Sequence, residues 1–219
     1  MYILKYKIFI AALSLFSVMN INAQENQTES TTPKSEKKLY VKGNALLIPI
    51  GVINAGLEYQ LSNKFTLQGD VLISPWKSFA GHEAQIYMGA IEGRYYFREA
   101  FKGWHVGANV SVGAYTLQKP NYWNDDVYVD AQIGIPSQYI NSQLYQKGYS
   151  ILFGVEGGYQ FRLAENWNMD IFAGIGSSQD FYKGYVRGTG ERYDSADGYN
   201  RSGEIIPYRG GVMISYRLK

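Results

Sequence analysis

Apolar and polar residues alternate along most of the chain after residue 39, and this period of two constrains its fold more than any other feature. Between Trp104 and Ala114, tryptophan, valine and alanine occupy every second position, while histidine, glycine, asparagine and serine fill the positions between them. Residues 149–163 repeat the pattern. Successive side chains of a β-strand point to opposite faces, so such segments predict strands with one apolar and one polar face.

Eight segments of this kind are present, and no helical period appears between them. They span residues 41–47, 53–61, 65–74, 86–98, 104–114, 149–163, 166–176 and 206–218. Tight connections near residues 62–63, 99–102 and 164–165 alternate with longer ones at 48–52, 75–84, 117–148 and 177–204. Short turns at one end and long loops at the other are typical of outer-membrane barrels. The pattern predicts an all-β chain, with an eight-stranded antiparallel up-and-down transmembrane β-barrel over residues 39–219.

Alternation alone leaves open which face points to the barrel axis. A soluble lipocalin-like barrel has its apolar face inside, whereas a membrane barrel has it outside against lipid. Large aromatic residues on the apolar face collect near the tight turns, which favours a girdle at the periplasmic interface of a membrane. The predicted girdle consists of Tyr59, Phe65, Tyr95, Phe97, Trp104, Tyr159, Phe161, Trp167 and Tyr216.

The other face is rich in glycine and carries charges of both signs, as expected for the narrow interior of an eight-stranded barrel. Opposed carboxylates and cations can satisfy one another there, because unpaired buried charge is costly. We therefore expect a filled interior with paired charges, in preference to an ion path or a solute channel. The predicted interior network consists of Lys42, Asn44, Glu58, Asp70, Glu92, Arg94, Glu156, Arg162, Asp170, Arg209 and Arg217.

Residues 1–23 have the pattern of a secretory signal peptide, with two lysines before a mostly apolar stretch and a small-residue cleavage site at 21–23. The alternative, a retained N-terminal anchor, is disfavoured because the apolar stretch is short and contains polar residues. Residues 24–38 have no large apolar side chain and are expected to form a flexible periplasmic lead-in. No later segment has the ~18 uninterrupted apolar residues of a transmembrane helix.

Composition excludes several classes of function. The 219-residue chain has no cysteine, which excludes disulfides and thiolate metal sites. Its 21 basic and 19 acidic residues are nearly balanced, which argues against a nucleic-acid partner. Asp125, Asp126 and Asp130 could contact Ca²⁺, but they lack the regular ligand spacing of a dedicated loop. We expect no cofactor and no bound metal.

Three motifs carry a resemblance to known proteins: VKGN at 41–44, NAGLEY at 54–59 and ISPW at 73–76. They are similar to an uncharacterised family of Bacteroidota outer-membrane proteins known only as a domain of unknown function. The strand pattern also resembles small barrels of the OmpA/OmpX type. The resemblance covers about residues 39–219 and implies the barrel and its location, without an established activity. Some relatives lie near fimbrial components, which would imply a role in assembling or displaying surface appendages.

The chain also departs from these barrels in two ways. The OmpA protein adds a peptidoglycan-binding domain, and that role is not expected to carry over because this chain ends within the eighth predicted strand. Many outer-membrane barrels finish on an aromatic residue, whereas the last residue here is Lys219. The departure leaves the assembly signal open.

A lipid A-modifying enzyme is one alternative, since some eight-stranded outer-membrane barrels have that activity. The deacylases among them resemble one another in having a histidine with a serine two residues later on the same strand face. Here His105 is followed by Gly107, which offers no nucleophile. His82 has no recognisable motif around it. We therefore expect no enzyme activity.

The two longest connections contain the best candidates for binding. Tyrosine and arginine are favoured at recognition surfaces because they combine contact area with hydrogen bonds. They could equally pack the loops onto one another above the barrel. The candidates are Tyr122, Trp123, Tyr128, Tyr139, Tyr182, Tyr185, Arg187 and Tyr193.

Together these patterns predict a monomeric, non-enzymatic outer-membrane protein with both termini in the periplasm. Its long loops would serve a structural, recognition or adhesion role, with a link to fimbrial assembly implied by the resemblance alone. Its partners would be outer-membrane lipid and an extracellular protein or glycan. A secreted soluble carrier is the second alternative, and it would be found in the culture supernatant without detergent.

Overall fold

The computed structural model describes residues 37–130 and 133–218. The predicted signal peptide at 1–23 and residues 24–36 of the predicted lead-in lie outside the described residues. Within the described ranges, no helix is long and apolar enough to cross a membrane.

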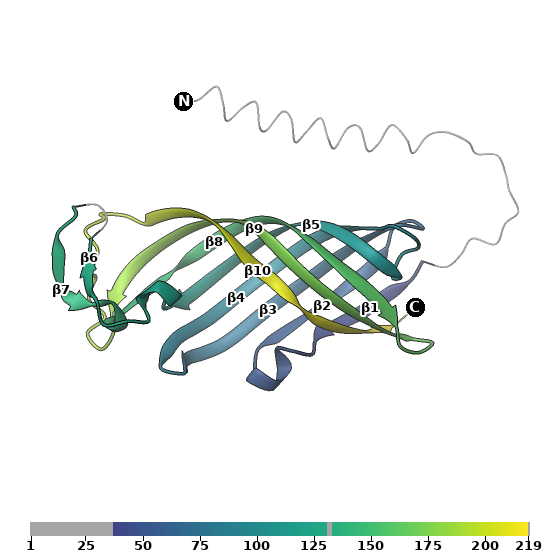
Figure 1. Cartoon of the computed structure of the whole chain (residues 1–219), viewed down its shortest axis with the longest axis horizontal. Coiled ribbons are helices and arrows are strands. Elements are labelled where there is room, and N and C mark those ends of the chain that lie inside the picture. Colours follow the sequence, from purple (N-terminus) through teal and green to yellow (C-terminus); the bar gives the residue numbers. More distant parts are fainter. Residues whose placement is uncertain (1–36, 131–132, 219) are drawn as a thin grey trace, which may run out of the picture. The chain divides into compact units, whose positions relative to one another are not determined.

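Eight strands close into a ring in the order β1-β10-β9-β8-β5-β4-β3-β2, forming a closed barrel (Figure 1). Every pair in the ring is antiparallel. The strands are β1 (Leu39–Asn44), β2 (Ile53–Gln60), β3 (Phe65–Phe79), β4 (His82–Tyr96), β5 (Gly103–Leu117), β8 (Leu144–Arg162), β9 (Trp167–Val186) and β10 (Asn200–Arg217). The prediction of an all-β chain with eight antiparallel strands is confirmed.

The connections differ from the prediction at the end far from the tight turns. The sequence predicts a loop at residues 75–84, but β3 and β4 continue to a two-residue turn at Ala80 and Gly81. Both residues have positive φ, 51° and 89°, as a tight hairpin turn that matches the strand twist requires. Alanine rarely adopts this conformation, so the sequence carries little signal of the turn.

A second hairpin lies within the longest connection. It pairs β6 (Val127–Val129) with β7 (Pro136–Ile140) and is flanked by the short 3-10 turns η2 (Pro120–Tyr122) and η3 (Asn141–Gln143). This hairpin lies beyond the ends of β8 and β9, at the left of the barrel in Figure 1. The predicted long loop therefore contains regular structure of its own.

The wall of the barrel is lower at β1 and β2 than elsewhere. The pairing of β10 with β1 begins at Met213, and the pairing of β3 with β2 ends at Ile73. Among the described residues, 200–211 of β10 and 74–79 of β3 therefore have a strand neighbour on one side only. Between these two edges lies the 3-10 turn η1 (Ile48–Ile50), which accepts a 2.8 Å hydrogen bond from the Trp76 indole.

The apolar face of the strands points outward. On β5, Val106, Val110 and Val112 are 46%, 47% and 57% exposed, whereas the intervening Asn109 and Ser111 are buried. The other long strands alternate in the same way. Polar side chains therefore fill the interior, which is the reverse of a soluble β-barrel core.

Candidate functional site

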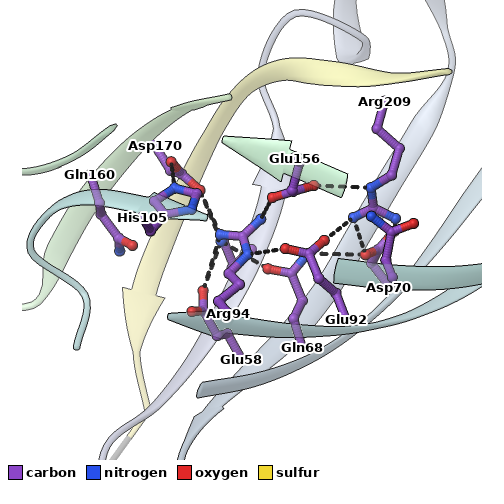
Figure 2. Close-up of polar contacts among 12 residues, drawn as sticks. Glu58, Gln68, Asp70, Glu92, Arg94, His105, Glu156, Gln160, Asp170 and Arg209 are labelled. Carbon is purple, nitrogen blue, oxygen red and sulfur yellow. Dashed lines mark hydrogen bonds and ion pairs between the residues drawn. The ribbon is translucent and has the colours of Figure 1, made fainter. Parts of the chain in front are cut away.

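Arg94 lies at the centre of the barrel interior and contacts carboxylates from four strands (Figure 2). Its guanidinium donates hydrogen bonds to Glu92 at 2.5 Å, Glu156 at 2.5 Å and Asp170 at 2.7 Å. Glu58 lies 3.6 Å from the same group. The Arg94 side chain is fully buried, so every one of its charged contacts is made inside the protein.

Lys42 supplies the second cation, on the side of the interior formed by β1. Its ammonium donates hydrogen bonds to Glu58 at 2.8 Å, Gln68 at 2.9 Å and Asp170 at 3.3 Å. Glu58 also accepts hydrogen bonds from the hydroxyls of Thr66 and Tyr96. The acceptor oxygens of this carboxylate are therefore satisfied from several directions.

Arg209 supplies the third cation, and it lies nearer the loop end of the network. It donates hydrogen bonds to Asp70 at 2.8 Å, Glu92 at 3.0 Å and Glu156 at 3.1 Å. Glu92 and Glu156 thus bridge Arg94 and Arg209 into one continuous network (Figure 2).

The network holds more acids than bases. Its cations are Lys42, Arg94 and Arg209, and its carboxylates are Glu58, Asp70, Glu92, Glu156 and Asp170. The imidazole of His105 lies 2.8 Å from Asp170 and can donate a hydrogen bond to it. This excess of acid means that loss of a cation is expected to be more harmful than loss of a carboxylate.

Two predicted members of the network lie elsewhere. Arg162 is exposed and donates a hydrogen bond to the Ala164 carbonyl, and Arg217 is half-buried. Both line a hollow at the tight-turn end of the barrel. They share the strand face of the interior residues, but they lie at the rim, where water can solvate them. The other nine lie inside, and all nine are buried or nearly so.

The turn between β4 and β5 folds inward and closes the tight-turn end. Ala100 and Phe101 are buried there together with Tyr40 and Tyr96. The Phe101 ring lies 4.4 Å from that of Tyr40, and its φ of 69° is a left-handed conformation that places the side chain under the barrel. We call these four residues the plug. The sequence contains no periodic signal for the plug, because residues in a turn do not alternate between two faces as strand residues do.

The opposite end is covered by a cluster that we call the cap. Its core residues Tyr128, Leu144 and Val186 are buried, and Tyr122, Tyr139 and Tyr193 pack against them. The rings of Tyr128 and Tyr193 are 4.7 Å apart, and the Tyr193 hydroxyl accepts a 2.8 Å hydrogen bond from Gln146. Burial raises the pKa of both the Tyr128 and Tyr193 phenols, so they stay neutral and pack as apolar rings.

The remaining predicted binding residues contact side chains at or near the ends of other strands. Trp123 is exposed and stacks on His82 at 4.3 Å, and Tyr185 stacks on Tyr145 at 5.6 Å. Tyr182 lies under the ammonium of Lys119, at 4.8 Å.

Arg187 ties the cap to the β4 end of the barrel through two hydrogen bonds to Glu83, at 2.8 and 2.6 Å. The hydrogen bonds to the Glu83 carboxylate raise the pKa of the Arg187 guanidinium. Four of the eight candidates, Tyr122, Tyr128, Tyr139 and Tyr193, thus belong to the cap. Whether any of the eight contacts a ligand stays a prediction.

The nine predicted girdle residues lie near the tight-turn end, and the rings of eight of them lie next to another girdle ring. The ninth, Tyr59, lies beneath the ammonium of Lys37, at 5.9 Å. Trp104 and Tyr159 are 5.1 Å apart, and Trp167 and Tyr216 are 4.9 Å apart. Phe65, Tyr95 and Phe97 form a similar row. Seven of the nine are more than a third exposed: Tyr59, Phe65, Phe97, Trp104, Phe161, Trp167 and Tyr216.

A cavity of about 280 Å³ lies next to the low part of the wall, above Arg209. Its lining combines apolar side chains from β3, β4 and β9 with the charged side chains of Asp70 and Arg209. Tyr208 and Pro207, at an irregularity in the β9–β10 pairing, complete the lining.

These observations define a closed antiparallel β-barrel with a charge-paired interior, an apolar outer face, a plug at one end and a cap at the other. The chain belongs to the family described as a protein of unknown function (DUF3575), whose family model matches residues 11–218. No protein with a curated description and no solved structure matches the chain.

Proposed function

We propose that this protein is an integral outer-membrane barrel, similar to the small OmpA/OmpX barrels, with no enzymatic role. Its job would be structural or one of surface recognition, with the cap presented outside the cell and both termini in the periplasm. The observation that carries this proposal is the unbroken apolar outer face. On β8, every outward side chain from Tyr149 to Phe161 is aromatic, aliphatic or glycine.

The height of this apolar face fits a bilayer. From Tyr149 to Phe161 the strand rises about 40 Å along its own axis, at about 3.4 Å per residue. With a barrel-strand tilt of about 45°, the band is roughly 28 Å tall, close to the ~25 Å apolar band of outer-membrane barrels. A soluble barrel would gain nothing from exposing valine, isoleucine and phenylalanine over that height.

The paired-charge interior supports a structural role in preference to transport. Arg94 and its partners fill the cross-section, and the plug and the cap cover its two ends. The cap is then the part of the chain best placed to meet a partner. Trp123 and Arg187 are exposed beside the cap, and side chains of these types fit an extracellular protein or glycan. The fimbrial link rests on the resemblance alone.

Epitope insertion can test location and orientation together. A short tag would be inserted at Thr189, between two exposed glycines of the β9–β10 connection that have positive φ, and separately at Asn63 in the β2–β3 turn. We expect antibody to label intact cells with the first tag, and cells with the second tag only after permeabilisation. Labelling in the reverse order would overturn the orientation, and release of the protein to the supernatant would favour the soluble carrier.

The rival function is modification of lipid A. Mass spectrometry of lipid A from a deletion strain would separate the two, because a structural barrel leaves the acyl pattern unchanged. An altered pattern that is restored by the wild-type gene would favour the enzyme.

A further inference from the structure

The outer wall of the barrel carries a groove of about 530 Å³ between β4, β5, β8 and β9. The small side chains of Ala114 and Thr116 form its floor. Tyr87, Tyr149 and Tyr199 form its sides, and the rings of Tyr149 and Tyr199 meet edge to face at 5.6 Å. A hollow of this size falls in the range of small-molecule sites, which commonly combine aromatic walls with a few charges.

Two lysines lie in the groove, and no carboxylate among the described residues forms an ion pair with either of them. Lys147 and Lys183 are directly opposite each other in the β8–β9 pairing, where like charges repel. In the part of the chain that the structure describes, the ion pairs at this end join other residues: Lys119 to Glu204, Arg187 to Glu83 and Arg192 to Asp194. Lys183 does lie over the Tyr199 ring, at 5.0 Å, but a ring does not neutralise its charge. The pair is therefore arranged to receive an anion.

The height of the lysines indicates which anion. Lys147 is the next outward residue after Tyr149, which ends the apolar run of β8. Below the groove, Val112 and Ile151 lie opposite each other on the apolar outer face. In the membrane orientation proposed above, on which this step depends, the lysines are level with the headgroups of the outer leaflet and the aliphatic side chains are level with the acyl chains.

We infer that the groove binds a phosphorylated glycolipid of the outer leaflet. Its phosphate would lie between the ammonium groups of Lys147 and Lys183, and its sugar ring against Tyr149 and Tyr199. Its acyl chains would continue down the wall over Val112 and Ile151. The bound phosphate would relieve the repulsion between the two lysines.

Reconstitution of the full chain tests the inference. The protein would be inserted into phosphatidylcholine vesicles with and without monophosphoryl lipid A, extracted gently, and examined by native mass spectrometry for retained lipid. We expect insertion into both vesicles and retention of monophosphoryl lipid A. Failure to insert into either vesicle would count against the membrane barrel itself, whereas insertion without retention would overturn this inference alone.

Three variants identify the site. K147A/K183A is expected to lower lipid retention about thirtyfold, from about 1 kcal/mol for each lysine. K147E places a carboxylate opposite Lys183, so it should abolish retention while leaving the barrel at least as stable as the wild type. K64A is the matched control, because Lys64 also lies near a tyrosine ring, at 5.8 Å from Tyr95, but at the tight-turn end.

Three results would contradict the site. Unchanged retention in K147A/K183A and K147E would show that the lipid binds elsewhere. Binding of inorganic phosphate as tightly as monophosphoryl lipid A would show a site for the free anion in place of a glycolipid. A loss in K64A equal to that in K147A/K183A would show general attraction between basic residues and lipid.

Discussion

At the scale of single residues, the interior depends on glycine as much as on charge. Gly158 faces inward beside His105, and a Cβ at this position would lie 2.6 Å from the His105 Nε2 atom and 2.7 Å from the Ile171 carbonyl oxygen. The absence of a side chain allows the imidazole to approach Asp170. Its neighbour Gly157 faces outward, where a methyl group would have the His105 carbonyl oxygen as its nearest contact, 3.8 Å away.

We therefore predict opposite outcomes for the same substitution at adjacent positions. Gly158→Ala should lower the free energy of unfolding by about 1–3 kcal/mol, because the strand backbone leaves the new methyl group no room. Gly157→Ala should change it by no more than about 0.5 kcal/mol. Urea unfolding in detergent micelles would measure both. Equal effects would contradict the structure, in which Gly158 faces the crowded interior and Gly157 faces the open outer surface.

The excess of acid in the network gives a second prediction. Arg94→Met should cost about 3–5 kcal/mol, because it leaves several buried carboxylates without their central cation. Glu92→Gln should cost only about 1 kcal/mol, because it removes one of the surplus charges and keeps an acceptor. The same unfolding measurement applies, with Arg162→Ala at the rim as the control.

The double variant tests whether the charges act as one network. Glu92→Gln introduced with Arg94→Met should recover part of the loss, because it lowers the uncompensated negative charge. Strict additivity of the two changes would show that Arg94 and Glu92 contribute independently.

Strand periodicity could predict the face of a residue but not whether a charge on that face is buried. The face was enough to place Glu58, Glu92 and Arg94 in the interior. It could not separate them from Arg162 and Arg217, which share their face and lie at the rim. Tyr96 interrupts the polar face in the sequence, yet its hydroxyl donates a hydrogen bond to Glu58 of the network. A tyrosine on the polar face is therefore a signal for a further member of the interior network.

At the scale of elements, the cap depends on contacts between segments far apart in the sequence. Tyr193 packs on Tyr128 of β6 and lies so close to Gly184 of β9 that a side chain there would overlap its ring. Asp194 accepts a 2.6 Å hydrogen bond from the Gly184 amide. The cap is therefore held by β9 as well as by its own hairpin.

Tyr193→Ala should open the cap without unfolding the barrel. The ring contacts and the bond to Gln146 would be lost together, a change of a type that costs about 3–5 kcal/mol at a packed site. Hydrogen exchange read by mass spectrometry should show faster exchange in residues 118–143 and 187–199, with β2 to β5 unchanged. Ile135→Ala, at an exposed position between β6 and β7, is the control.

If exchange rose throughout the barrel, the cap would instead be part of one cooperative unit with the strands. The cap and the plug were beyond prediction for the same reason. Each depends on how irregular segments meet in space, and neither Phe101 nor Tyr193 belongs to a repeating pattern. The Ala80–Gly81 hairpin was missed because its turn chemistry is atypical at alanine.

At the scale of the whole molecule, the distribution of side chains is the reverse of that in a soluble domain: polar side chains fill the interior and apolar side chains cover the outer face. A chain with this distribution of exposed valine, isoleucine and aromatic residues would aggregate in water. The same distribution is the stable one when lipid is the surrounding solvent. A charge placed on the outer face is therefore expected to change the free energy of unfolding differently in water and in lipid.

Ile175 and Gln179 allow this comparison on one strand, because both lie on the outward face of β9 and are exposed. Ile175 pairs with Val155, the middle residue of the outward run from Tyr149 to Phe161 on β8. Ile175→Arg should lower the free energy of unfolding from phospholipid vesicles by about 2–4 kcal/mol, as for a position near the bilayer midplane. Gln179→Arg, nearer the cap, should lower it by no more than about 1 kcal/mol, as at an interface. In water, two exposed positions on one strand would tolerate arginine equally. A difference that depends on height along β9 is thus expected only if lipid covers Ile175, and equal small effects would rule out the membrane orientation from which the girdle, the cap and the lysine groove take their proposed roles.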